Sequence, residues 1–178
     1  MEDMLKISEV VKESIVDGPG IRYVVFTQGC PHNCKGCHNP QTHDFEGGRY
    51  VKISDIVDDI KKNPLLKGIT ISGGEPFMQA NQVAKLISKL DKDRYDIITY
   101  TGFEYEYLLN NGNDVNGYLN LLNSTDILID GKFDIDKRSI SVPFRGSTNQ
   151  RAIDVKSSLS KNEVCLYDFE KRRSLCYV

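Results

Sequence analysis

Three cysteines stand close together in the first quarter of the chain. Cys30, Cys34 and Cys37 lie within eight residues, in the segment CPHNCKGCHNP. Three thiolates on one short loop can hold three irons of a four-iron, four-sulfur cluster, whereas complete cysteine ligation needs a fourth thiolate. The run of three therefore predicts a cluster with one iron left open for a small molecule, much as catalytic zinc sites leave one position open.

A structural zinc site, built from cysteines and a histidine such as His38 or His43, is the alternative interpretation of this segment. Short cysteine spacings are common in zinc sites. The position of the loop favours the iron–sulfur cluster, because it directly follows a β-branched and aromatic stretch at 23–27. A second glycine-rich loop, at 73–76, follows the next such stretch along the chain.

Hydrophobic patterning indicates which elements position these loops. Runs rich in β-branched and aromatic residues predict strands over 23–27, 68–72, 95–101 and 127–129. Apolar residues at three- and four-residue steps predict helices over 54–63, 79–90, 104–110 and 115–122. Strands that alternate with helices imply a mainly parallel sheet with right-handed crossovers. The cysteine loop, GGEP, TG and DGK each follow a strand and should meet at its carboxyl edge.

The length limits the architecture. A closed eight-unit barrel takes about 250 residues, and this chain has 178. We expect an α/β fold: an incomplete, TIM-like barrel with about five or six parallel strands, open on one side. One domain should span residues 1–178, with a motif-bearing core at about 16–151 and a C-terminal appendage of uncertain structure at about 154–178.

Composition excludes several classes of function. The net charge of -2 gives no basic field that would recruit nucleic acid. No apolar run approaches the roughly 20 residues that span a bilayer, and the N-terminus lacks the pattern of a secretory signal, so we expect no membrane association and a cytoplasmic location. The remaining cysteines, Cys165 and Cys176, are expected to be ordinary thiols. A fourth cluster ligand or a redox pair is the alternative for them.

The motifs together resemble a known family. C-x3-C-x2-C after a strand, followed by Gly73-Gly74-Glu75-Pro76, resembles the pattern of radical S-adenosylmethionine enzymes, over about Val16 to Arg151. The segment DGPGIR at 17–22 resembles the branch that activates glycyl-radical enzymes. The short length, with DGKF at 130–133 and RGSTNQR at 145–151, resembles the activating proteins of anaerobic ribonucleoside-triphosphate reductase.

This resemblance implies a cofactor set, a reaction and partners. One 4Fe-4S cluster would cleave S-adenosyl-L-methionine reductively, and the product radical would oxidise a glycine in a C-terminal loop of anaerobic ribonucleoside-triphosphate reductase. A flavodoxin- or ferredoxin-type protein would donate the electron. The alternatives are an activase of another glycyl-radical enzyme, such as pyruvate formate-lyase, and a short radical enzyme that acts on a small molecule. Outside radical chemistry, a zinc-bearing interaction module or a simple electron carrier stays open.

The resemblance also implies roles for individual residues. The cluster would be held by Cys30, Cys34 and Cys37, with no catalytic side chain beyond the cluster and cofactor. S-adenosylmethionine would be bound by the backbone at Gly36, Cys37 and His38 (adenine), by Gly73 and Gly74 (methionine moiety), by Glu75 (amino group), and by Asp130 and Lys132. These last two would share a face if the chain there is extended, with Lys132 pairing the cofactor carboxylate.

Overall fold

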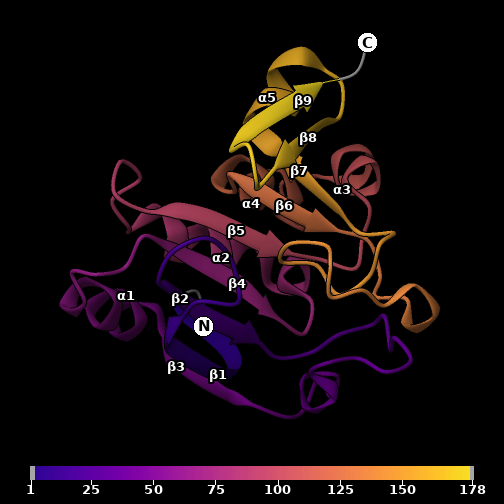
Figure 1. Cartoon of the computed structure of the whole chain (residues 1–178). Coiled ribbons are helices and arrows are strands. Elements are labelled where there is room, and N and C mark those ends of the chain that lie inside the picture. Colours follow the sequence, from indigo (N-terminus) through magenta and orange to yellow (C-terminus); the bar gives the residue numbers. More distant parts are fainter. Residues whose placement is uncertain (1–2, 177–178) are drawn as a thin grey trace.

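The computed structural model describes residues 3–176, and a nine-stranded sheet runs through this part of the chain (Figure 1). The strand order is β3-β1-β2-β4-β5-β6-β7-β8-β9. The strands are β1 (Met4–Ser14), β2 (Arg22–Thr27), β3 (Arg49–Lys52), β4 (Gly68–Gly73), β5 (Asp96–Tyr100), β6 (Ile127–Asp130), β7 (Arg151–Asp154), β8 (Cys165–Asp168) and β9 (Arg173–Cys176). The N-terminal strands and the C-terminal hairpin thus occupy opposite ends of one sheet.

The centre of the sheet is parallel, as the strand–helix alternation predicted. β2, β4, β5 and β6 pair in parallel, with Val25 opposite Ile71 and Ile71 opposite Thr99. The α/β partial-barrel class is confirmed, but the parallel part has four strands rather than five or six. The reason is that β1 and β7, which flank it, pair antiparallel to their neighbours.

Helices cover one face of the sheet and form the main core with it. They are α1 (Ile53–Lys62), α2 (Ala80–Ser88), α3 (Tyr105–Asn111), α4 (Tyr118–Ser124) and α5 (Val155–Lys161), with short 3-10 turns at η1 (Pro40–Thr42), η2 (Pro76–Gln79) and η3 (Ile135–Lys137). Alternate residues of each central strand face this core, as Ile97 does, while Ile98 faces a smaller cluster on the opposite side.

The N-terminal strand escaped prediction from the sequence. Leu5 and Ile7 are fully buried, but most later residues of β1 are exposed or half-buried and several are charged. An eleven-residue strand whose buried residues are only Leu5, Ile7 and Ser14 gives a weak alternating pattern. Pairing with β2 and β3 supplies its stability instead.

The C-terminal segment continues the sheet through α5 and the β8–β9 hairpin. Here the expectation of ordinary thiols is wrong, because Cys165 and Cys176 form a disulfide across the hairpin. Glu163 lies beside them, and this trio is the one compact set of potential metal ligands found within residues 3–176. Its two sulfurs are bonded to each other, so it is a cross-link and not a metal site.

Two long loops leave the same edge of the sheet. The cysteine loop (purple) and segment 131–150 (orange) both extend to the right of the sheet in Figure 1. They pack together: the rings of His38 and Phe133 lie 4.8 Å apart. A Cβ on Gly36 would come within 2.9 Å of Ile135. A separate finding is that no helix in residues 3–176 has the length and apolar character needed to cross a bilayer.

Candidate iron–sulfur and cofactor site

The cysteine loop is closed at its base by backbone hydrogen bonds. Gly29 N–H donates to Thr42 O at 2.9 Å, and Cys30 N–H donates to His43 O at 3.1 Å. Gly29 has a φ of +96°, a backbone conformation that glycine adopts readily and that residues with a side chain rarely adopt. The loop therefore leaves the end of β2 as a pinned Ω-shaped excursion that carries all three clustered cysteines.

The three cluster cysteines are half-buried free thiols that line one cavity. Burial raises the pKa of the Cys30 and Cys34 thiols. Around Cys34 the backbone N–H of Phe133 and the charge of Lys132 oppose that shift. Bound iron would stabilise the thiolates much more strongly, since coordinating thiols are deprotonated outright. The donor set is therefore of the kind that iron–sulfur clusters use.

Their spacing bears on the zinc alternative. A tetrahedral zinc ion holds thiolates at about 2.3 Å, so its ligand atoms must lie close to one another. Within residues 3–176 the three cluster cysteines and their neighbouring histidines do not form a set with all ligand atoms inside 4.8 Å. As they stand, these side chains are therefore not arranged around a single zinc ion.

The Gly73-Gly74 turn packs directly against the base of the cysteine loop. Gly74 N–H donates to Thr27 O, and Glu75 N–H donates to Gly29 O, each at 2.8 Å. A Cβ on Gly73 would come within 2.6 Å of the Phe26 and Thr27 backbone, and one on Gly74 would collide with Gly29 O. Both glycines also line the cavity. The close approach of the two loops is therefore enough to require glycine at both positions.

Glu75 is fully buried below the cavity and its carboxylate is already engaged. Oε1 accepts from Phe77 N–H at 3.0 Å and from Thr101 Oγ1 at 2.9 Å. Oε2 accepts from Gly102 N–H at 2.9 Å and lies 2.6 Å from His32 Nε2. The expected contact with the cofactor amino group is therefore not open in this arrangement. Glu75 ties the cysteine loop, through His32, to the end of β5.

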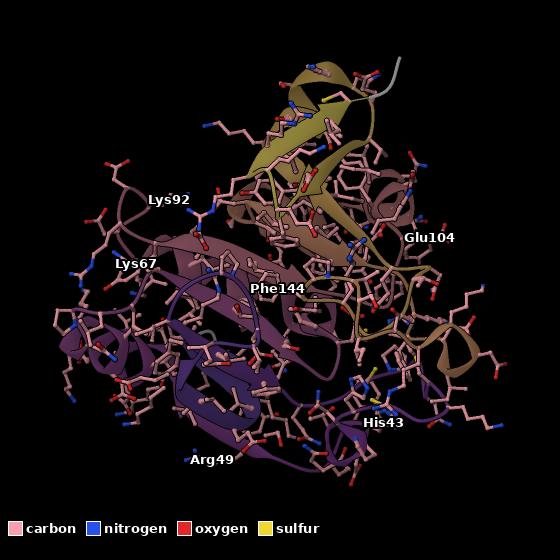
Figure 2. The ribbon with its side chains drawn as sticks, in the orientation of Figure 1. His43, Arg49, Lys67, Lys92, Glu104 and Phe144 are labelled. Atoms are coloured by element: carbon pink, nitrogen blue, oxygen red, sulfur yellow. A yellow bond between two sulfur atoms is a disulfide. The ribbon has the colours of Figure 1, made fainter. Side chains whose placement is uncertain are left out.

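The cavity itself has a volume of about 820 Å³ and opens at the carboxyl edge of the parallel strands. Its wall includes all three cluster cysteines and residues from the β2, β4, β5 and β6 ends. Figure 2 labels His43 and Phe144, which come from the two long loops and line this same cavity. Segments about a hundred positions apart in the sequence thus close around one space.

Half of the residues expected at the cofactor line this cavity, namely Cys37, His38, Gly73 and Gly74. The others lie outside its wall: Gly36, Glu75, Asp130 and Lys132. Gly36 turns with a φ of +72° against Ile135, so its backbone faces the neighbouring loop.

Asp130 and Lys132 are separated by a turn and do not share a face. Gly131 has a φ of +92°, which interrupts the extended backbone on which that expectation rested. Asp130 is buried and accepts from Arg151 Nε at 3.0 Å, Arg151 Nη2 at 2.5 Å and Tyr105 N–H at 2.8 Å. Lys132 is exposed, close enough to Cys34 to act on its charge.

Two cavity residues had weaker signals in the sequence. Tyr100 ends β5, and its hydroxyl donates to Phe144 O at 2.6 Å, which holds the 131–150 segment over the cavity. Arg145 is half-buried and lines the cavity, and within residues 3–176 no carboxylate lies within ion-pair distance of it. Desolvation lowers the pKa of this guanidinium. Its place in the polar RGSTNQR segment was the one signal that could have found it.

Comparison with protein families matches residues 16–153 to the model described as "4Fe-4S single cluster domain". The curated relatives include the anaerobic ribonucleoside-triphosphate reductase-activating protein of Vibrio cholerae, 33% identical over 144 residues, which cover 76% of this chain and 89% of the relative. The protein of the same name from Enterobacteria phage T4 is 31% identical over 144 residues, covering 76% of this chain and 85% of the relative.

Two further similarities are more limited. The pyruvate formate-lyase-activating enzyme of Staphylococcus aureus is 42% identical over 84 residues, which cover 44% of this chain and 34% of that enzyme. Among solved structures, QueE from Escherichia coli superposes with a TM-score of 0.41 at 17% identity, covering 56% of this chain and 52% of that one. The first similarity is confined to a part of the chain, and the second is too distant to bear on function.

Proposed function

Because this chain belongs to the radical S-adenosylmethionine enzymes with a 4Fe-4S single cluster domain, in the branch that activates glycyl-radical enzymes, we propose that its substrate is anaerobic ribonucleoside-triphosphate reductase. The proposal is supported by similarity over 144 residues to proteins named as the activating proteins of that reductase. The observation that carries it is structural: three cluster cysteines, the Gly73-Gly74 turn and the 131–150 segment enclose one cavity.

In this proposal the three cluster cysteines hold the 4Fe-4S cluster. When bound and reduced by an outside donor, such a cluster would supply the electron for reductive cleavage of S-adenosylmethionine to methionine and a radical able to take hydrogen from a glycine. The protein supplies position and shielding. Gly73 and Gly74 let the turn come close to the cofactor, and Cys37 and His38, which line the same cavity, offer backbone groups to it.

Arg145 is the group that we assign to the cofactor carboxylate. It lines the cavity as a half-buried cation, and its hydrogen bonds to Pro143 O and Gln150 O are long, at 3.4 Å and 3.3 Å. A desolvated guanidinium gains from a carboxylate partner through charge-assisted hydrogen bonds. Lys132, which the sequence favoured for this role, is exposed beside Cys34 and is better placed to modulate the cluster.

The electron comes from outside the chain in this proposal. The five cysteines divide into three free thiols at the cavity and one disulfide pair, which leaves none for a second cluster. We therefore propose a flavodoxin- or ferredoxin-type protein as the donor.

The test combines reconstituted protein, S-adenosylmethionine, a reductant and the anaerobic reductase without oxygen. The expected result is a glycyl radical doublet in the paramagnetic spectrum, which disappears when the reductase glycine is replaced by alanine. Cofactor cleavage without a radical on the reductase would contradict the proposal while leaving the radical chemistry intact.

A second candidate is an activase of pyruvate formate-lyase, supported by 42% identity over 84 residues. The same experiment with pyruvate formate-lyase in place of the reductase separates the two candidates. A doublet on that protein alone would favour the second.

A further inference from the structure

Exposed apolar side chains gather at the mouth of the cofactor cavity. The four most exposed large apolar side chains of residues 3–176 are Ile140 at 98%, Val115 at 88%, and Ile15 and Val16 at 74% each. Val16 and Ile140 lie at the opening of the cavity, and Ile15 directly precedes Val16. Apolar groups held in water near one opening, and not scattered singly, are typical of interaction sites.

We propose that Ile15, Val16 and Ile140, here called the apolar rim, dock the polypeptide loop that carries the target glycine. This inference rests on the proposed function and names the surface that recognises its protein substrate. The rim is built from two segments that lie far apart in the sequence, one before β2 and one after η3. Both must therefore be in place before a partner can bind.

Both segments of the rim are fixed to the body of the protein. Ser14 Oγ donates to the Asp17 carboxylate at 2.5 Å, and Thr70 Oγ1 donates to Asp17 O at 2.8 Å. On the other segment, the bond from Tyr100 to Phe144 O holds the backbone just beyond Val142. These hydrogen bonds already order the backbone of both segments. A partner that covers the apolar side chains therefore pays little further conformational entropy on this side of the interface.

The rim continues inward as an apolar wall. Phe26, Val142 and Phe144 line the cavity behind it. A segment that covers the rim can thus extend into the cavity and keep contact with apolar side chains along its path. This continuity explains how a glycine on a loop could reach the cofactor while the flanking residues exclude water, which a radical reaction requires.

The exposure of Ile140 and the charge of Arg138 favour a polypeptide over a small molecule. A small ligand held deep inside the cavity would leave most of the Ile140 side chain in solvent, because that side chain lines the opening and is 98% exposed. Arg138 also lies at this mouth, is exposed, and has no carboxylate within ion-pair distance among residues 3–176. The partner loop should therefore carry apolar side chains near its glycine and an acidic side chain opposite Arg138.

The test compares the double variant Ile15→Ser/Ile140→Ser with Val115→Ser. Val115 is a matched control, because it is 88% exposed and stands away from the cavity, where its carbonyl accepts from Asn81. Glycyl radical formation is followed over a range of reductase concentrations. Cleavage of S-adenosylmethionine without reductase, iron content and thermal unfolding are measured for every protein.

The rim variant should raise KM for the reductase about tenfold, which corresponds to about 1.4 kcal/mol of lost binding. Its iron content and partner-independent cleavage should match wild type, and Val115→Ser should match wild type throughout. A wild-type KM in the rim variant would overturn the docking proposal alone. A wild-type enzyme that forms no radical on the reductase would overturn the proposed function and, with it, this partner.

Discussion

Asp130 forms a buried ion pair with Arg151. Breaking this pair tests whether Asp130 stabilises the fold beside the site or binds the cofactor. Arg151 bridges two carboxylates of different exposure: Asp130 is 1% exposed, whereas Glu106 is 47% exposed. It donates to Glu106 at 2.9 Å and 2.7 Å, and to Asp130 at 3.0 Å and 2.5 Å. One guanidinium thus forms a buried ion pair with Asp130 and an exposed ion pair with Glu106, here called its buried arm and its exposed arm.

The two arms should differ in energy by several-fold. Replacement Arg151→Met removes both arms. It leaves the Asp130 carboxylate buried with one backbone donor, from Tyr105. Removing one partner of a buried pair costs roughly 3–5 kcal/mol. Since Arg151 is 32% exposed and water can enter, we expect a loss of about 3 kcal/mol, the lower end of that range. Replacement Glu106→Gln, the matched control on the exposed arm, should cost about 0.5 kcal/mol.

Denaturant unfolding and calorimetry measure both losses. In a chain of this size, about 3 kcal/mol lowers Tm by roughly 6–12 °C. Binding of S-adenosylmethionine to the reconstituted Arg151→Met and Asp130→Asn proteins should stay near wild type at a temperature where both are folded. Unchanged stability in both variants, together with at least tenfold weaker cofactor binding, would refute this reasoning and place Asp130 at the cofactor.

The exposed arm also predicts a pH dependence. Hydrogen bonds from Arg151 lower the pKa of Glu106 below its ordinary value of 4.5. Stability from a lowered carboxyl pKa is present above the unfolded value and is lost as the pH falls through the folded value. The difference in Tm between wild type and Glu106→Gln should therefore be constant near neutral pH and vanish in acid. A difference that grows in acid would contradict the assigned sign.

Two further predictions concern the tail and the cofactor carboxylate. Replacing Cys165 and Cys176 by Ser opens a cross-link that closes a sequence separation of 11 residues, and should lower the free energy of unfolding by about 2–3 kcal/mol. Iron content and cofactor cleavage should persist, and their loss would place the tail at the site. Replacing Arg145 by Met should weaken S-adenosylmethionine binding about tenfold or more, measured by anaerobic titration calorimetry, because it removes a charge-assisted contact. Lys132→Met should have a smaller effect on that affinity, and the reverse order would return the carboxylate to Lys132.

Local sequence patterns were enough to predict the parallel core and the loop that gathers three of the cysteines. Runs such as 23–27 and 68–72 became the central strands β2 and β4 with small shifts at their ends. The three cluster cysteines sit in one loop of eight residues, so their proximity follows from chain connectivity alone. The carboxyl-edge rule then brought the glycine turn to the same place, because parallel strands all end on one side.

Contacts between distant segments were decided by the tertiary structure. The sequence could not predict that Arg151 would pair with Asp130, because strand β7 had no recognisable pattern and its antiparallel register with β6 sets that meeting. Nor could it predict the full burial of Glu75, which depends on donors from β5 and from the cysteine loop. Such partners are chosen by the packing of whole elements, in which a buried carboxylate must find donors wherever the fold provides them.

The C-terminal disulfide is another contact that the tertiary structure decided. In a chain with an odd number of cysteines, five in all, the sequence favoured ordinary thiols at Cys165 and Cys176 and kept a redox pair only as an alternative. They meet because β8 and β9 form a hairpin whose register sets these two residues opposite each other. Spacing along the chain thus determined that three thiols share one loop. Register across the sheet determined the disulfide, since strand pairing brings together side chains whose sequence separation carries no information about their distance.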